Sequence, residues 1–212
     1  LIAQRKGVAL QEEDASTALT RKQLNEMALA EQEAEEREIL HAEIFGRIAA
    51  MLADGDLEVQ RVGATALAIY TDRDESPDPA EAANCAVNAG VLGPLVHVFT
   101  SRNRVAVMES ARALENITVE LPAEQNRALR AGALDACLRL IADSSHPVTL
   151  RASGARALRG LLLQNPPACR RAVEKGALDA LTALQRLILS NNSLTGTIPA
   201  LDALTALWML NL

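Results

Sequence analysis

Residues 107–117, VMESARALENI, contain a short motif that occurs three times in this chain of 212 residues. The motif is a small residue, alanine, any residue, alanine and leucine, and it stands at residues 63–67 (GATAL), 110–114 (SARAL) and 154–158 (GARAL). Its leucines are 47 and 44 residues apart. Alanines beside a leucine let neighbouring helices approach closely, and both residue types lead the helix-propensity ranking. The motif therefore predicts helices of one kind that recur along the chain.

A second landmark keeps nearly the same period. It is a glycine followed by an apolar residue and leucine, at residues 88–92 (NAGVL), 130–134 (RAGAL) and 174–178 (EKGAL), with the glycines 42 and 44 residues apart. Such a period is typical of stacked helical repeats, whose units are roughly 40–47 residues long. We expect each glycine to form a tight turn between a short helix and a longer one, where φ is positive.

Polar segments separate the predicted helices. Residues 52–56 and 142–147 carry Asp, Gly, Ser and Pro, which suit the end of one helix and the N-cap of the next. Residues 71–79 are polar, contain two prolines and make this connection five residues longer than the two equivalent ones. Insertions of this kind belong in loops between stacked units, so we expect a loop here.

Together, residues 88–117 resemble one complete unit of the armadillo-repeat family, and the resemblance covers about residues 44–187. It implies an all-α, right-handed armadillo-like α-solenoid of about three to four helical repeats. In that family a ladder of asparagines on the third helices lines a concave groove that holds an extended partner peptide. Asn116 occupies the ladder position here, whereas Ile69 and Gly160 stand there in the repeats before and after.

The resemblance also implies which side chains line the groove. The family's aromatic residue one turn before the ladder position is replaced here by Thr65, Arg112 and Arg156. By helical spacing the expected groove residues are Arg61, Thr65, Met108, Arg112, Asn116 and Arg156. We expect Asn116 to clamp the backbone of the partner, and Arg112 and Arg156 to attract acidic side chains. The alternative is that these arginines are only a solvated face.

The two ends of the chain differ from the repeats. Residues 21–43 read as one charged helix, which we expect to belong to an N-terminal cap spanning residues 1–43, with residues 1–20 loosely ordered. Residues 184–199 resemble a plant-type leucine-rich repeat, with the spacing LxxLxLxxNxL followed by GxIP, and a second copy begins at residue 207. This resemblance covers about residues 181–212 and implies a short strand with Leu187, Leu189 and Leu194 pointing inward. The predicted parts are therefore residues 1–43, 44–187 and 188–212, and we expect a longer protein on both sides.

Composition excludes several classes of function. Aromatic residues make up only 2% of the chain although 49% is apolar, which is unlike the lining of an enzyme cleft. The net charge of −6 leaves no basic footprint for nucleic acid. Residues 82–101 carry no charge, but they contain Gly, Pro, Asn and His, so they predict two short helices rather than a membrane span. Three separated cysteines, Cys85, Cys137 and Cys169, indicate neither a disulfide framework nor a metal site, and no cofactor is expected.

The sequence therefore predicts a non-catalytic, cytoplasmic or nuclear scaffold that binds a protein or peptide, and an acidic segment is one candidate partner. An alternative is a ligand-sensing or receptor-type protein whose recognition is carried by a longer leucine-rich-repeat domain. A further alternative is that the junction at residues 170–200 joins two unrelated reading frames. The sequence does not predict the oligomeric state.

Overall fold

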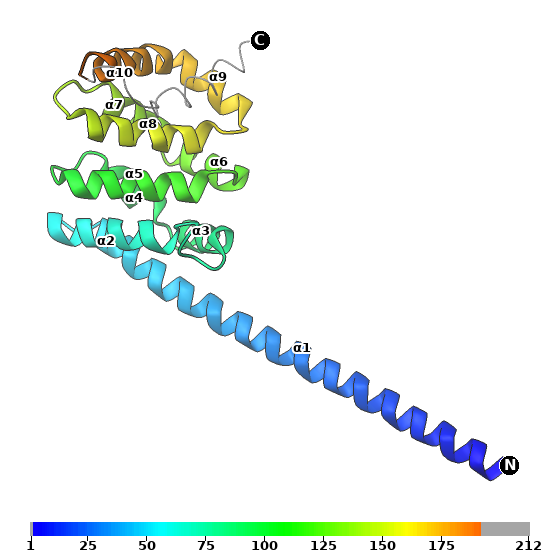
Figure 1. Cartoon of the computed structure of the whole chain (residues 1–212). Helices are drawn as coiled ribbons and strands as arrows, with labels where there is room; N and C mark the ends of the chain where they lie inside the picture. The colour runs from blue at the N-terminus through cyan, green and yellow to red at the C-terminus, as the bar shows by residue number, and fades with distance from the viewer. Residues whose placement is uncertain (1, 192–212) are drawn as a thin grey trace. The chain divides into compact units, whose positions relative to one another are not determined.

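A computed structural model describes the backbone of residues 2–191 and the side chains of residues 23 and 26–185. Within residues 2–191 the chain forms ten helices and no strand (Figure 1). The helices are α1 (Ile2–Leu52), α2 (Leu57–Tyr70), α3 (Pro79–Asn88), α4 (Leu92–Val98), α5 (Arg104–Thr118), α6 (Pro122–Arg130), α7 (Ala133–Ala142), α8 (Val148–Leu162), α9 (Pro166–Glu174) and α10 (Ala177–Asn191).

The chain divides into two compact parts, and the first, Leu1–His41, is built from α1. The side chains of residues 26–40 are all exposed. The expectation that residues 1–20 are loosely ordered is wrong, because the helix already begins at Ile2. Its sequence is rich in Ala, Leu, Glu, Gln, Lys and Arg and contains no proline, so helical propensity is high along its whole length.

The second part begins at Ala42 and is a stack of repeats, each with two short helices and one long helix. One repeat is α3, α4 and α5, and the next is α6, α7 and α8. The long third helices α2, α5 and α8 pack against one another in succession, as Figure 1 shows. The predicted solenoid of three-helix units is therefore confirmed, and the uncharged residues 82–101 form two short helices, α3 and α4, as expected.

The three landmark glycines adopt the left-handed conformation that their turns require. Gly90, Gly132 and Gly176 have φ of 82°, 88° and 84°. At each turn the glycine N–H donates to a carbonyl of the preceding short helix, for example Gly132 to Leu129 O at 3.2 Å. No glycine stands at the equivalent place near residues 41–43, and there α1 continues without a turn to Leu52.

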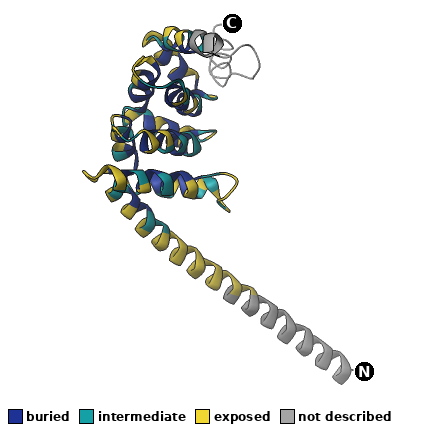
Figure 2. Cartoon of the chain, turned by 60° about the vertical axis from the view of Figure 1, so that its left-hand side comes forward, coloured by how far each residue is buried: buried dark blue, intermediate teal, exposed yellow. Residues whose placement is uncertain are grey.

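Small residues form the contacts between the helices. The first alanine and the leucine of the repeated motif are buried in every copy, with no more than 1% of the surface exposed. These residues are Ala64, Leu67, Ala111, Leu114, Ala155 and Leu158. Figure 2 shows the buried residues gathered on the sides of the helices that face one another. A core with so few aromatic side chains is filled because the helices pack close together.

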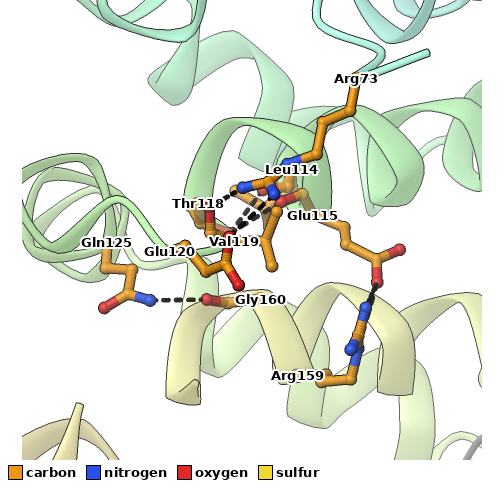
Figure 3. Close-up of polar contacts among 9 residues, drawn as sticks. All are labelled: Arg73, Leu114, Glu115, Thr118, Val119, Glu120, Gln125, Arg159 and Gly160. Carbon is orange, nitrogen blue, oxygen red and sulfur yellow. Dashed lines mark hydrogen bonds and ion pairs between the residues drawn. The ribbon is translucent and has the colours of Figure 1, made fainter. Parts of the chain in front are cut away.

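Gly160 on α8 lies where two third helices, α5 and α8, approach closely. A Cβ atom at this position would lie 2.6 Å from Oγ1 of Thr118 and 3.1 Å from Cα of Glu115, both on α5. The Gly160 carbonyl accepts a hydrogen bond of 2.9 Å from Nε2 of buried Gln125 on α6 (Figure 3). The asparagine that the ladder pattern would place here has no room, which explains the glycine.

The turns from a third helix to the next repeat hold a feature that the sequence did not signal. Glu120 and Gln164 have φ of 60° and 56°, although neither is glycine. Both stand two residues before a proline that opens the next helix, Pro122 or Pro166. The same strained conformation thus recurs at equivalent positions of two repeats.

The C-terminal part of the described chain is helical. Leu187 and Leu189 lie on α10, so the short strand expected at these residues is wrong. The Ala- and Leu-rich sequence of α10 has high helical propensity, and buried Ala177, Leu181 and Leu184 pack into the core as a second helix of the repeat does. The remainder of the predicted leucine-rich repeat, including Leu194, lies outside the described residues.

Two of the cysteines are part of the core. Cys137 and Cys169 are 0% and 1% exposed. Burial raises the pKa of both thiols, because the thiolate would lose its hydration. Among the helices of the described residues, none is long and apolar enough to cross a membrane.

Glycine and non-glycine residues with positive φ should respond differently to substitution. Gly132→Ala should lower the free energy of unfolding by about 1–2 kcal/mol, because a Cβ atom is strained at positive φ. Gln164→Gly should not lower it, because glycine relieves the same strain and this offsets its larger entropy in the unfolded chain. Urea denaturation followed by circular dichroism measures both, and equal losses in the two variants would contradict the assignment.

The contact at Gly160 predicts a steric effect. Gly160→Ala should lower the free energy of unfolding by about 1–3 kcal/mol, because α8 must move away from α5. The matched control is Gly93→Ala on α4, where an added Cβ meets nothing within 4 Å. This control should be neutral or stabilising by up to about 1 kcal/mol. A Gly160→Ala variant as stable as the control in thermal denaturation would show that the two helices are free to separate.

Candidate functional site

The third helices α2, α5 and α8 each present one stripe of side chains that is not buried between helices. On α5, Asn103 fixes the start of the helix, since its Oδ1 accepts hydrogen bonds from the N–H groups of Val105 and Ala106 at 3.1 and 3.2 Å. Residues of α5 that are three or four positions apart then lie on the same side of the helix. We call the combined surface the third-helix face: Glu58, Arg61, Val62, Thr65 and Ile69 on α2, Val105, Met108, Glu109, Arg112 and Asn116 on α5, and Thr149, Ala152, Arg156 and Arg159 on α8.

The structure places all six predicted groove residues on the third-helix face. Arg156 and Met108 are exposed, and the other four, Arg61, Thr65, Arg112 and Asn116, are partly exposed. Because α5 packs against both α2 and α8, the three helices carry these residues as neighbouring rows.

Asn116 uses its amide within the stack. Its Nδ2 donates a hydrogen bond of 3.1 Å to the Ala68 carbonyl on α2, across two adjacent third helices. Its Oδ1 has no donor among the described residues. Asn116 also lines a cavity of about 380 Å³ together with Arg73, Asp78 and Leu121. One N–H of this amide is therefore engaged, and the acceptor oxygen is available.

The three predicted arginines differ in how far their charge is compensated. Arg61 forms an ion pair of 2.7 Å with Glu58, and this hydrogen bond lowers the pKa of the Glu58 carboxyl. Arg112 lies 3.3 Å from Asp72 and 3.6 Å from Glu109. Arg156 forms no ion pair with any described residue and is exposed. Arg156 is therefore the cation of this set that faces solvent without a carboxylate.

Two charged contacts that the sequence interpretation missed tie neighbouring repeats together (Figure 3). Arg159 on α8 donates to Oε1 of Glu115 on α5 at 2.9 Å. Residues 115 and 159 both follow a landmark leucine, so aligning the repeats could have revealed opposite charges at equivalent positions. Arg73, in the inserted loop, pairs with Glu120 at 2.9 Å and donates to the Val119 carbonyl at 2.7 Å. The repeat pattern gave no signal for this contact.

The third-helix face is apolar at one end. Four large apolar side chains on it are between 37% and 48% exposed: Val62, Ile69, Val105 and Met108. All four lie on α2 and α5. The equivalent positions of α8 carry Ser153, Gly160, Thr149 and Ala152. The face therefore changes from apolar at α2 and α5 to basic at α8, where Arg156 and Arg159 lie.

Comparison with known proteins identifies the fold. No family model matches the sequence, and no curated protein matches it. Among solved structures, the chain is similar to an engineered protein, with 27% identity and a TM-score of 0.64 over 79% of this chain and 62% of the other. It is also similar to a designed armadillo repeat protein in complex with the peptide (KR)4, with 24% identity and a TM-score of 0.61 over 79% of this chain and 64% of the other.

A third structure, of computationally designed armadillo repeat proteins for modular peptide recognition, has 19% identity and a TM-score of 0.60 over 82% of this chain and 74% of the other. The chain spans less than two thirds of the length of the first engineered proteins that it matches, 62%, 63% and 37%. The repeat spacing, the helix order and these similarities agree. The described second part of the chain has the all-α, armadillo-like solenoid fold.

Proposed function

We propose that the third-helix face binds an extended segment of a partner protein and catalyses no reaction. The observation that carries this proposal is the recurrence of exposed or partly exposed side chains at one position of three adjacent helices, Thr65, Arg112 and Arg156. Packed helices are about 8–10 Å apart, and an extended chain advances about 3.3 Å per residue. Each repeat thus matches about two to three residues of an extended partner. The solved structure of a designed armadillo repeat protein in complex with a peptide is similar to this chain, which supports this use of the fold.

Asn116 acts in this proposal as a hydrogen-bond acceptor. Since Nδ2 already donates to the Ala68 carbonyl, the free Oδ1 accepts an N–H of the partner backbone. The bond to Ala68 also fixes which way the amide points. The contact gives affinity without selecting a side chain, because every residue except proline has a backbone N–H.

Side-chain selection follows from the two ends of the face. Apolar partner side chains pack on Val62, Ile69, Val105 and Met108, which together expose the largest apolar surface of the face. An acidic side chain binds Arg156, whose planar guanidinium donates two parallel hydrogen bonds to a carboxylate. Arg61 and Arg112 contribute less attraction, because Glu58, Glu109 and Asp72 already compensate them.

Selection from a displayed library of random peptides tests the proposal. Peptides retained by the full chain should be enriched in Val, Leu, Ile, Asp and Glu. Arg156→Glu should weaken the binding of a selected peptide about tenfold, and combining it with Arg112→Glu should weaken it further. Fluorescence anisotropy of the labelled peptide measures the dissociation constants.

The matched control is Arg171→Glu, which makes the same charge change at an exposed residue of α9. It should leave the affinity within about twofold of the original, because α9 contributes nothing to the third-helix face. If the double variant keeps its helical circular dichroism spectrum and binds the selected peptides as tightly as the control does, the third-helix face is not their binding site.

A further inference from the structure

A cavity of about 550 Å³ lies at the turns that precede the third helices α5 and α8. One wall is the turn at residues 99–104, and the other is the end of α7 with the turn that follows it. The lining residues are Phe99, Thr100, Ser101, Arg102, Arg104, Ala136, Arg139, Leu140, Asp143, Ser145, His146 and Leu150. None of them belongs to the third-helix face, so the cavity is a separate site.

Three arginines of the cavity have no protein partner. Arg102, Arg104 and Arg139 are exposed, and none forms a hydrogen bond or ion pair with a described residue through its side chain. Arginines at the contacts between repeats behave differently, since Arg73 and Arg159 each bind a carboxylate at 2.9 Å. The cavity is therefore lined by three arginines whose side chains have no partner among the described residues.

One carboxylate faces this cluster, and it is already engaged. Oδ1 of Asp143 accepts a hydrogen bond of 2.9 Å from the Ser145 N–H, and Oδ2 lies 3.5 Å from Nε2 of His146. Hydrogen bonds from Ser145, with smaller contributions from His146 and Arg151, hold the pKa of Asp143 below its usual value. The lining holds three arginines and one carboxylate, which is an excess of two positive charges when His146 is left out of the count.

The cavity continues along the edge of the stack. A second cavity of about 210 Å³ is lined by Leu57, Gln60 and His97 and shares Thr100, Ser101 and Arg102 with the first. The two together follow the turns of three successive repeats. An elongated depression of this kind fits a chain that lies along the edge better than it fits a single small ion.

We propose that this cavity binds a phosphorylated serine or threonine side chain within an extended segment of a partner protein. A phosphate monoester carries a charge of about −1.5 to −2 at neutral pH and has three acceptor oxygens. One such group matches the excess charge of the cavity and the three arginines, whereas carboxylates would have to come in a pair. Guanidinium groups bind phosphate oxygens through two parallel hydrogen bonds, which favours arginine over lysine at such sites. The residues flanking the phosphate lie in the adjoining depression.

Two immobilised peptide pools of degenerate sequence, one with a central phosphoserine and one with serine, test the proposal on the full chain. The phosphoserine pool should retain at least about tenfold more protein than the serine pool. Substituting glutamine for Arg102, Arg104 and Arg139 together should reduce retention to that of the serine pool. Asp143→Asn should raise retention severalfold, because it removes the opposing charge and keeps the acceptor for the Ser145 N–H.

The matched control replaces three exposed arginines away from the cavity, Arg130, Arg170 and Arg171, by glutamine, and it should change retention by less than about twofold. Equal retention on the two pools, or equal losses in the two triple variants, would overturn the proposal. The same holds if inorganic phosphate binds as tightly as the phosphoserine pool in calorimetry. It holds also if vesicles containing a phosphoinositide bind the chain through these arginines while the two pools retain it equally.

Discussion

The close packing of successive third helices is the constraint on which the rest of this structure depends. Small residues at the contact positions of α2, α5 and α8 let the helix backbones approach, and Gly160 lies where even a Cβ atom would meet α5. A core of Ala, Leu, Val and Ile gains its stability from many short contacts rather than from large side chains. The repeat period follows from this, because each copy of the motif must return to the same position on its neighbour.

Polar contacts add the specificity that small apolar residues cannot supply. Gln125 donates to the carbonyls of Gly160 and Leu163, and its own oxygen accepts from Asn165, so a buried amide ties one repeat to the start of the next. The pair of Glu115 on α5 and Arg159 on α8 bridges this repeat to the one before it, near the surface. Apolar alanine surfaces would tolerate sliding of one helix along another, whereas these bonds are satisfied at a single register.

The same repetition produces both the third-helix face and the arginine-lined cavity at the turns. Each repeat contributes one long helix to the third-helix face. The turn that precedes this helix belongs to the row of turns along which the cavities lie. Side chains that differ between repeats therefore become rows on the surface, apolar to basic along the face and arginine-rich along the turns. A solenoid can change the exposed positions that contact no neighbouring helix, such as Arg156, without disturbing the core. That independence allows one stack to carry two different kinds of recognition.

The sequence by itself determined the features that are local or periodic. It predicted the three-helix repeat, the positive φ of the turn glycines and the placement of Arg61, Thr65, Met108, Arg112, Asn116 and Arg156 on one face, because helical spacing and the repeat period fix these. Only the tertiary structure decided which groups meet, such as Asn116 with the Ala68 carbonyl and Arg112 with Asp72. It also placed Arg102, Arg104 and Arg139 around one cavity. It also decided that α1 is continuous and that Leu187 and Leu189 are helical. Contacts between residues more than forty positions apart depend on how far one helix is shifted and rotated against the next. Neither the shift nor the rotation can be predicted from a single sequence. A leucine pattern suits a strand or a helix equally well, so packing settles the choice.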